Sequence, residues 1–465
     1  MDSFIKVSDD SILIDIDKKK PRNQTLNFDE FKQKIENRNI SVGVIGLGYS
    51  GLPLAVSFAE LNFAVTGIEF DSSRVKMLNS GKSYIENVAS TQIKNLINSD
   101  KFYAVSDLKV LPELDVIIIC DQVPIGIPKN KDVSFVMALV ENIVSALSKT
   151  QLIIFETVTP PGALESVIFP LFEDQNLVVN KDFFLAISPY RGEPGNTSVQ
   201  FSLIPRIVAG ITKESKDLAN CLMKTIFKQT IELSSARTAE MTKFLEQSHA
   251  WVNQALINQF AIISHGLGIN IWEVIKAASS NPFEYIRHLP CPGQGTVSRY
   301  DDEAFALSWK KSFEGFEVDI IDNAIQINTT CMRKFVINKI TDMLNAQKKC
   351  INDAKILIVG VAAKRNISDW HESPCVEIIK ELIDKKANVY YHDPHVSQLP
   401  LDKMGFSLSS IKLETEMLKW VDLTVIMMDH KEIDFEKIVN ESPLVLDTKN
   451  ATHKCKGQKT NVSIL

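Results

Sequence analysis

The sequence predicts an α/β protein with two Rossmann-like, doubly wound domains joined by a long helical connector. Short apolar runs alternate with helix-compatible segments in the first half of the chain, and a second such series occupies the last quarter. The stretch between them has long helical periodicity without strand signals. Alternating strands and helices are typical of a parallel sheet with crossover helices. The chain has 465 residues and is 45% hydrophobic, so it can bury two or three cores, since a single core stops growing at about 250–300 residues.

The composition excludes several classes of partner. The formal net charge is −6 and the basic residues are dispersed, whereas binding to nucleic acid needs a clustered positive face. The seven cysteines are scattered and lack CxxC spacing, which argues against a disulfide framework and a zinc site. We therefore expect no nucleic-acid partner, no bound metal and a location in a reducing cytoplasm.

The chain divides into four predicted segments. Residues 1–38 form a polar extension without the apolar core of a signal peptide. A first α/β domain follows at 39–234, a helical connector and dimerisation region at 235–346, and a second α/β domain at 347–465. No uninterrupted apolar stretch has the length of a bilayer span, so we expect no membrane partner.

The elements of the first domain follow in order from its apolar runs. A strand begins after Ser41 and leads into a glycine turn and a helical stretch that ends near Glu60. Short apolar runs of strand length then recur at Ala64–Phe70, Asp115–Cys120, Gln151–Phe155 and Phe183–Ile187.

The connector and the second domain differ sharply in pattern. The connector holds two long helical periodicities, Thr238–Leu267 and Phe316–Leu344. The second domain returns to apolar runs, which predict strands at Lys355–Ala362, Asn388–Tyr391, Leu423–Ile426 and Leu444–Leu446. Two such α/β halves predict a ligand cleft between them.

The glycine turn of the first domain has the pattern of a dinucleotide site. Gly46-Leu-Gly-Tyr-Ser-Gly51 follows a strand and opens a helix. In this pattern Gly46 makes the tight turn, Gly48 lets the backbone approach a pyrophosphate, and Gly51 allows close helix–strand packing. The helix amino terminus supplies free N–H groups to the phosphates, and Tyr49 and Ser50 lie in the same loop. The alternative is a glycine turn that only packs the helix.

The end of the second predicted strand favours the dinucleotide site over a turn that only packs the helix. Glu69 lies where a carboxylate accepts hydrogen bonds from the ribose hydroxyls and repels a 2′-phosphate. Strand, spacing and acid agree, so we expect NAD as the cofactor rather than NADP. Arg74, on the following helix, is a candidate for contact with a cofactor phosphate, and a solvated helix arginine is the alternative.

From Phe31 to about Val396 the chain resembles the UDP-glucose/GDP-mannose dehydrogenase family, and most closely its members that oxidise UDP-N-acetylhexosamines at C6. The resemblance rests on motifs in a specific order: Gly46–Ala55, Asp71–Ser83, Asp115–Pro124, Thr157–Pro160, Ser188–Gly195, Ala239–Lys243 and Ser368–Pro374. It implies an NAD-binding first domain, a second domain that binds the nucleotide sugar, a homodimer and a role in surface polysaccharide synthesis. In that family a cysteine captures the aldehyde, and one alcohol becomes one carboxylate with two NAD consumed.

The resemblance also implies roles for single residues. Thr157 matches a threonine near the nicotinamide and the catalytic water, and Lys243 matches a lysine that stabilises the developing oxyanion. Arg191 and Lys364 match positions on the substrate side, and His371 stands where the family has an arginine that meets the substrate's phosphates.

Other positions depart from the family pattern. Tyr190 stands where the family has the glutamate of its Ser-Pro-Glu-Arg motif, and Gln247 stands at an asparagine position. Both departures fall on motifs that carry the chemistry.

The segment that resembles the catalytic loop carries no cysteine at the family's position. Alignment on the loop's Pro-Gly pair places Ser298 there, and alignment on the later Trp-Lys pair places Arg299 there. Asp302 or Glu303 replaces the loop's usual aspartate, in the same two registers. Cys291 lies nearby, and we interpret it as a small buried residue rather than a nucleophile.

Three functions therefore stay open at this point. The leading hypothesis is an NAD-dependent oxidoreductase acting on a UDP-sugar, whose reaction stops at the aldehyde or proceeds through the aldehyde hydrate. The second is a homologue that binds NAD or nucleotide sugar without turnover, because residues of one catalytic unit act non-additively. The third is a redox-neutral isomerase in which bound NAD takes and returns a hydride.

Overall fold

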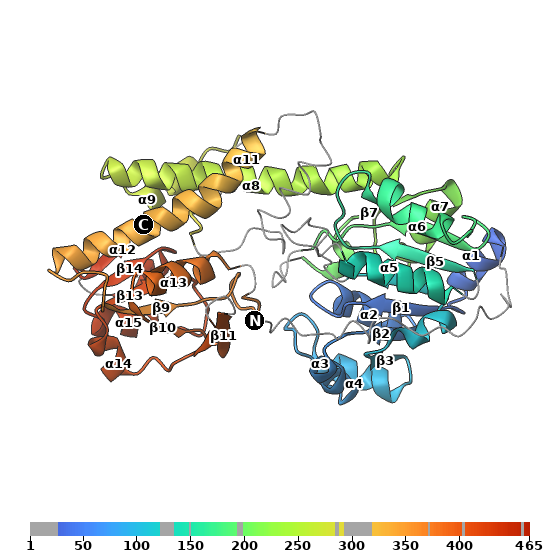
Figure 1. Cartoon of the computed structure of the whole chain (residues 1–465), viewed down its shortest axis with the longest axis horizontal. Coiled ribbons are helices and arrows are strands. Elements are labelled where there is room, and N and C mark those ends of the chain that lie inside the picture. Colours follow the sequence, from blue (N-terminus) through green and yellow to red (C-terminus); the bar gives the residue numbers. More distant parts are fainter. Residues whose placement is uncertain are drawn as a thin grey trace. The chain divides into compact units, whose positions relative to one another are not determined.

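The computed structural model describes residues 27–120, 134–147, 150–192, 199–283, 288–292, 319–370, 373–401, 405–456 and 460–465. These residues form two compact units (Figure 1). Helix α8 (Ala236–Gly266) contributes to both, because the division falls between Glu246 and Gln247. The part before this division is called the amino-terminal unit below, and the part after it the carboxy-terminal unit.

The amino-terminal unit is built on an eight-stranded sheet with the order β3-β2-β1-β4-β5-β6-β7-β8. The first six strands in this order are parallel, β7 is antiparallel to β6, and β8 is parallel to β7. The strands are β1 (Ser41–Ile45), β2 (Ala64–Ile68), β3 (Phe102–Val105), β4 (Val116–Ile119), β5 (Gln151–Phe155), β6 (Phe183–Ile187), β7 (Arg206–Gly210) and β8 (Thr230–Glu232). This order is doubly wound, so ligands are expected beyond the carboxyl ends of the parallel strands.

Helices connect and cover these strands. They are α1 (Phe28–Glu36), α2 (Gly51–Glu60), α3 (Ser72–Asn79), α4 (Ser90–Asn98), α5 (Ser134–Ala146), α6 (Phe169–Glu173) and α7 (Lys213–Met223), with short turns η2 (Leu108–Glu113), η3 (Leu164–Ile168) and η4 (Phe201–Leu203). One core cluster joins Ile117 of β4 and Ile153 of β5 to Ile143 of α5 and Phe172 of α6. Because helices cover the strands, β4 is buried over its whole length and reads as a continuous apolar run.

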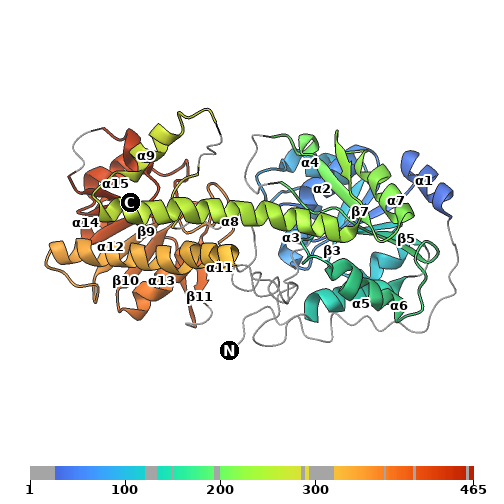
Figure 2. The same ribbon diagram turned by 90° about the horizontal axis from the view of Figure 1, so that it is seen from above.

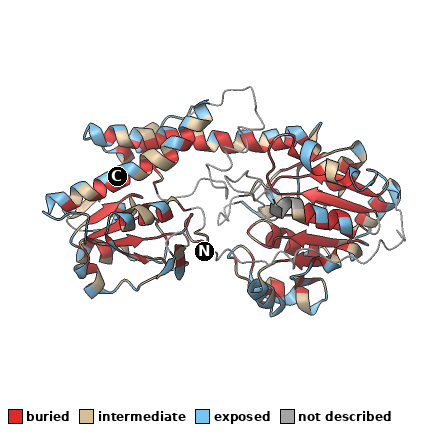
Figure 3. Cartoon of the chain, in the orientation of Figure 1, coloured by how far each residue is buried: buried red, intermediate tan, exposed pale blue. Residues whose placement is uncertain are grey.

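The carboxy-terminal unit contains a five-stranded parallel sheet with the order β10-β9-β13-β14-β15. Its strands are β9 (Lys355–Val359), β10 (Asn388–His392), β13 (Leu423–Ile426), β14 (Val445–Asp447) and β15 (Val462–Ile464), and β11 (Gln398–Leu401) pairs with β12 (Phe406–Ser409). The central strands of both sheets are buried, whereas β8 and β15 at their edges are partly exposed (Figure 3).

The helices of this unit are α9 (Ile271–Ala278), α11 (Asp319–Gln326), α12 (Met332–Ala346), α13 (Pro374–Asp384), α14 (Thr415–Trp420) and α15 (Phe435–Glu441), with turns η5 (Ile327–Cys331) and η7 (Ala451–Lys454). Figure 2 shows α12 lying along α8. Ala261 of α8 and Ile340 of α12 share one core cluster with Ile356 of β9. The second half of α8 is therefore part of the core of this unit.

The predicted fold class is confirmed, with parallel strands in the sheets of both units and a long helix, α8, that contributes residues to each. Three predicted strands, Gln151–Phe155, Phe183–Ile187 and Leu423–Ile426, are found with the same bounds. The predicted helix Thr238–Leu267 is α8, and Phe316–Leu344 corresponds to α11, η5 and α12 within the described residues. The four segment boundaries stay a prediction. Within the described part of the chain, no helix combines the length and apolarity needed to cross a membrane.

Candidate active site

The turn after β1 forms a close backbone cradle. Gly46 has φ +85°, a conformation that favours glycine. A Cβ on Gly51 would lie 1.9 Å from the carbonyl oxygen of Gly46 and 3.0 Å from Cβ of Cys120. No other residue therefore fits at Gly51 without movement of the backbone. Helix α2 begins at Gly51, so its first N–H groups lie in this turn, as binding of a pyrophosphate requires.

The carboxyl end of β2 carries the acidic edge of the same cradle. Glu69 is buried, and its carboxylate accepts a hydrogen bond of 3.1 Å from the backbone of Asp71. The guanidinium of Arg74 lies 3.6 Å from the Glu69 carboxylate and 5.2 Å from the ring centre of Tyr84. Tyr84 in turn donates a hydrogen bond of 2.7 Å to the carbonyl of Leu47 in the glycine turn. Arg74 is thus joined to the cradle through Glu69 and Tyr84.

Two further predicted residues of the cradle are placed by the same turn. Tyr49 is buried, and the Ser50 hydroxyl donates a hydrogen bond of 3.3 Å to the carbonyl of Cys120. Asp71 caps α3, and its pKa is lowered: burial raises it, but hydrogen bonds from Ser73 and Arg74 and the charge of Arg74 outweigh burial. Apart from Thr157, which follows β5, the residues that we predicted to bind NAD therefore lie around the turn after β1 and the end of β2.

A buried ion pair lies at the carboxyl ends of the neighbouring strands. Glu156 follows β5 and pairs with Arg206 at the start of β7, and both side chains are almost fully buried. The Cys120 thiol donates a hydrogen bond of 2.8 Å to the Glu156 carboxylate. The Arg206 guanidinium lies 5.8 Å from the ring centre of Tyr190. Thr157 is buried directly after this glutamate, so the predicted catalytic threonine stands beside an internal charge pair.

The first turns of α8 are fixed to the loop that follows Thr157. Glu240 is fully buried, and its carboxylate accepts hydrogen bonds from the Thr159 hydroxyl at 2.6 Å and from the backbone N–H groups of Gly162 at 2.6 Å and Leu164 at 3.0 Å. Burial raises the pKa of Glu240 to about 7, although the hydrogen bonds from Thr159, Leu164 and Gly162 lower it.

Lys243 lies one turn after Glu240 and is 8% exposed, so it is not a helix-surface lysine. Its ammonium lies 3.8 Å from the carboxylate of Glu246, on the next turn. The other oxygen of that carboxylate accepts hydrogen bonds from Arg191 at 2.6 and 2.9 Å. Glu246 therefore joins two predicted site residues, Lys243 and Arg191, through one carboxylate.

The raised pKa of Glu240 predicts a pH-dependent stability. Because its pKa is higher in the folded protein than the ordinary value of 4.5, its contribution is fully present below pH 4.5 and is lost as pH rises through about 7. One pKa unit corresponds to about 1.4 kcal/mol, so the loss is on the order of 3 kcal/mol. We expect Glu240→Gln to reduce the difference in the free energy of unfolding between pH 5 and pH 8, measured by urea denaturation. A difference equal to that of the wild type would contradict the raised pKa of Glu240. Glu173→Gln, at an exposed position, serves as the control.

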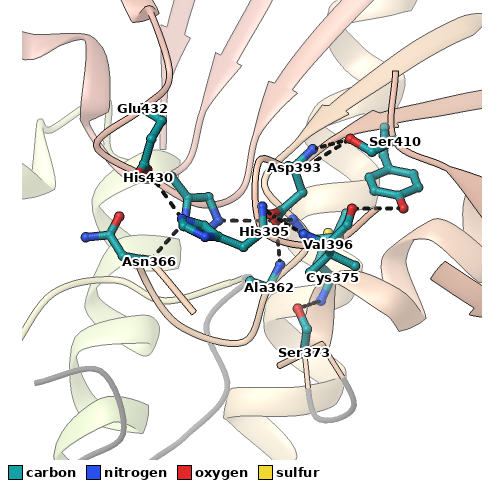
Figure 4. A network of polar contacts seen from close by, with 12 residues as sticks. Ala362, Asn366, Ser373, Cys375, Asp393, His395, Val396, Ser410, His430 and Glu432 are labelled. Atoms are coloured by element: carbon teal, nitrogen blue, oxygen red, sulfur yellow. Dashed lines mark hydrogen bonds and ion pairs between the residues drawn. The ribbon is translucent and has the colours of Figure 1, made fainter. Parts of the chain in front are cut away.

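The carboxy-terminal unit places Lys364 in the loop after β9, where it is buried. The backbone N–H groups of Val361 and Ala362, in the same loop, donate hydrogen bonds of 2.7 and 3.0 Å to the Asp393 carboxylate (Figure 4). Elsewhere in this unit the Lys449 ammonium lies 3.7 Å from the Cys291 sulfur. Cys291 is intermediate in burial, so the expected small buried residue is found only in part, and its lack of a nucleophilic role stays a prediction.

Several predicted residues lie outside the described residues: Ser298, Arg299, Asp302, Glu303 and His371. Their roles stay predictions. Each of the two units also contains candidate functional residues that the sequence reasoning missed. Glu240 and Glu246 frame Lys243 at the i−3 and i+3 positions of one helix, and this spacing was a readable signal. Asp393 and His430 had no such signal, because their partners are distant in sequence.

The sequence matches the models of three domains of one protein family. The model of the NAD binding domain of the UDP-glucose/GDP-mannose dehydrogenase family matches residues 40–231, that of its central domain matches 237–330, and that of its UDP binding domain matches 357–454. The chain belongs to the UDP-glucose/GDP-mannose dehydrogenase family. The predicted family and the predicted cofactor, NAD, are thereby confirmed.

Individual members of this dehydrogenase family resemble the chain over most of its length. The UDP-N-acetyl-D-mannosamine dehydrogenase of Methanocaldococcus jannaschii is 31% identical, over 90% of this chain and 95% of its own length. The UDP-N-acetyl-D-glucosamine 6-dehydrogenase of Pseudomonas aeruginosa is 29% identical, over 77% and 84%. The solved structure of UDP-D-ManNAc dehydrogenase from Pyrococcus horikoshii has a TM-score of 0.79 at 26% identity and covers 91% of this chain and 98% of its own.

The residues present fit NAD. Gly46 has the positive φ of the tight turn, and a Cβ on Gly51 would meet the Gly46 carbonyl, so the turn has the close helix–strand packing of a dinucleotide-binding site. The Glu69 carboxylate stands at the strand end that faces the ribose in this fold. The chain is thus an NAD-dependent nucleotide-sugar dehydrogenase by family and by the construction of its first domain.

Proposed function

We propose that this dehydrogenase oxidises the C6 alcohol of a UDP-N-acetylhexosamine. The observation that carries the proposal is the buried Lys243 ammonium, framed by Glu240 and Glu246 on α8. The curated relatives are named for UDP-N-acetyl-D-mannosamine and UDP-N-acetyl-D-glucosamine, and these two sugars are our candidate substrates.

Each predicted site residue has a separate role in the proposed reaction. NAD, when bound, accepts hydride from the alcohol carbon. The Lys243 ammonium stabilises the negative charge that develops on the C6 oxygen, and a preorganised donor in a site shielded from water is effective in this role. Thr157 positions the water that hydrates the aldehyde. Arg191 and Lys364 contribute positive charge on the substrate side, and His371 is proposed to meet the substrate's phosphates.

The segment that resembles the catalytic loop bears on how the oxidation proceeds. No cysteine occurs between Cys291 and Cys331, so we propose oxidation without a covalent thiohemiacetal. Ser298 and Asp302 are the loop residues proposed to take part, with Arg299 and Glu303 in the alternative register. The reaction then ends at the aldehyde with one NADH, or continues through the hydrate to the carboxylate with two.

The test is the stoichiometry of the reaction. Purified protein is incubated with NAD and UDP-N-acetylglucosamine, UDP-N-acetylmannosamine or UDP-glucose, NADH is followed by absorbance, and the product is identified by mass spectrometry. Two NADH per carboxylate mean that the cysteine is dispensable, and one NADH with an aldehyde means a truncated oxidation. No NADH despite measurable binding of UDP-sugar rejects the proposal in favour of a non-catalytic homologue. A product isomeric with the substrate, with unchanged mass and different chromatographic retention, formed without net NADH would favour the isomerase.

A variant series sharpens this test. If the protein stops at the aldehyde because the thiol is missing, Ser298→Cys or Arg299→Cys restores carboxylate formation, because a thiolate is both a good nucleophile and an adequate leaving group. Ser298→Ala is the matched control. A restored second NADH in only one of the two cysteine variants would also identify the correct register.

We further propose a homodimer built through α8. Four apolar side chains of this helix recur at helical spacing and are 45–68% exposed: Leu256, Phe260, Ile263 and Leu267. Such a stripe on one helix is self-complementary about a two-fold axis, and the family resemblance implies the same partner, a second copy. Analytical ultracentrifugation is expected to show a dimer that Phe260→Glu dissociates. A monomeric wild-type protein would reject this assembly.

The cellular setting remains a proposal as well. The seven cysteines are scattered along the sequence and lack CxxC spacing, which supports a reducing cytoplasm. The family resemblance supports a role in polysaccharide synthesis, where the product would supply a uronic acid. Loss of that uronic acid from the surface polysaccharide after gene deletion is the expected result, and an unchanged polysaccharide would reject the role.

A further inference from the structure

We propose that Asp393 and His430 are a pair of positioning residues that hold the Lys364 loop in the shape that binds the UDP part of the substrate. This inference rests on the proposed function, since it assigns UDP to the carboxy-terminal unit. The pair itself lies inside the protein. Side-chain exposure is 0% for both residues, so they act through the loop rather than by contact with the ligand.

Asp393 is the centre of the arrangement. It follows β10, and its Oδ2 atom accepts hydrogen bonds from the backbone N–H groups of Val361 and Ala362 at 2.7 and 3.0 Å. Its Oδ1 atom accepts from the backbone N–H groups of His395 and Val396 at 2.8 and 3.1 Å. One carboxylate therefore fixes its own turn and the turn after β9 at the same time.

His430 holds the other end of the loop after β9, at Asn366. The hydrogen bonds of Asp393 and His430 to this loop are together called the brace below. Its Nδ1 atom accepts a hydrogen bond of 2.9 Å from the backbone N–H of Asn366. A backbone N–H can only donate, so the imidazole proton of the neutral ring is on Nε2. Nε2 lies 3.2 Å from Oδ2 of Asp393 and donates to it (Figure 4). The backbone N–H of Lys431 also donates to the Asn366 side chain at 3.0 Å.

These bonds lower the pKa of Asp393. Burial raises the pKa of this carboxyl, but the hydrogen bond from His430 and the backbone hydrogen bonds from His395 and Ala362 outweigh burial. The carboxylate is therefore held in its charged form, in which both oxygens accept. Hydrogen bonds to a charged group are stronger than those between neutral groups.

The place of this brace in the sheet connects it to ligand binding. Strand β9 has β10 on one side and β13 on the other, so the chain changes direction across the sheet at β9. In an open α/β sheet, ligands bind beyond the carboxyl ends of the strands at this point. Asp393 comes from the end of β10, His430 follows β13, and the loop that they hold follows β9. Lys364 lies inside the held segment, between Ala362 and Asn366.

The experiment compares UDP and NAD affinities in the full-length protein. Isothermal titration calorimetry with UDP is run on the wild type, Asp393→Asn, His430→Asn and His430→Gln. Asparagine at 430 keeps an acceptor near the Nδ1 position, and glutamine keeps a donor near the Nε2 position. We expect a rise in the Kd of UDP of about tenfold or more for Asp393→Asn, because an isosteric amide turns a donor toward N–H groups. The two His430 variants should show smaller rises, with the Kd of NAD unchanged in all three.

A matched control separates positioning from general stability. Asp422 also accepts a backbone N–H bond from the β9 strand, at Lys355, but it lies at the opposite end of the sheet. Asp422→Asn is expected to lower the melting temperature and leave the Kd of UDP unchanged. Hydrogen exchange should accelerate at residues 361–366 in Asp393→Asn and the His430 variants, and not in Asp422→Asn.

Each other outcome overturns the inference. Folded variants with the wild-type Kd for UDP would reject the positioning role while the proposed function stands. A parallel loss of UDP and NAD affinity would indicate a general structural effect and would reject it too. If the wild-type protein itself does not bind UDP, the proposed function and this inference fall together. Should Asp393→Asn fail to fold, the His430 variants decide.

Discussion

Replacing Lys243 with alanine is expected to lower kcat by about 10²–10³-fold, the usual cost of removing one oxyanion donor. The buried ammonium is the positive group that α8 places one turn after the fixed Glu240 carboxylate. In the proposed reaction, the charge on the C6 oxygen would then develop without a positive partner, near the carboxylate of Glu246, which lies 3.8 Å from the ammonium. Steady-state kinetics with NAD and the best UDP-sugar of the substrate panel measure the loss.

The control for this prediction is Arg237→Ala on the same helix. Arg237 is 63% exposed and pairs with Glu165, so kcat should stay within about twofold, since exposed ion pairs contribute little. The Kd of NAD should not change in either variant. A Lys243→Ala protein with wild-type kcat would show that the lysine is structural and would remove the main support for the proposed chemistry.

Replacing Arg206 with methionine is expected to lower the free energy of unfolding by about 3–5 kcal/mol, because it leaves the other charge of a buried pair uncompensated. The side chains of Arg206 and Glu156 are almost fully buried. Burial lowers the pKa of Arg206 to about 10, so the guanidinium still carries its charge at neutral pH. Urea denaturation measures this change in the free energy of unfolding.

Two further variants make this prediction specific. Lys224→Met removes an ion pair whose lysine is 58% exposed, and its effect should stay below about 1 kcal/mol. The double variant Arg206→Met, Glu156→Leu should recover part of the loss, because an apolar pair replaces two buried charges. A single Arg206→Met variant as stable as the wild type would show that the pair contributes no net stability.

The fold was predictable because its signals are local. Strands such as β5 are continuous apolar runs between turn residues, and the glycine turn has fixed spacing in the sequence. Strand β8 gave no such signal, since it is three residues long and partly exposed. Local sequence patterns therefore predict strands that are buried on both faces better than short strands at the edge of a sheet.

The candidate site was predictable only in part, for a physical reason. Glu69 and Lys243 belong to motifs of fixed spacing, so their positions could be read directly. The partners of Glu240 lie 76–81 residues away along the chain, and those of Asp393 include His430 on another strand end. Such pairs are set by strand order in the folded sheet, which the sequence reasoning did not specify strand by strand.

The two parts of the cofactor cradle differ in how they can evolve. The turn at Gly46 and Gly51 is fixed by backbone clearance, since a single methyl group at Gly51 would meet a carbonyl oxygen. The edge at Glu69 is a side chain with an arginine, Arg74, already beside it. A drift in preference from NAD toward NADP therefore needs only the loss of one carboxylate, whereas a new cofactor class would require rebuilding the turn. Selection on cofactor supply can act at this edge while the rest of the nucleotide site stays unchanged.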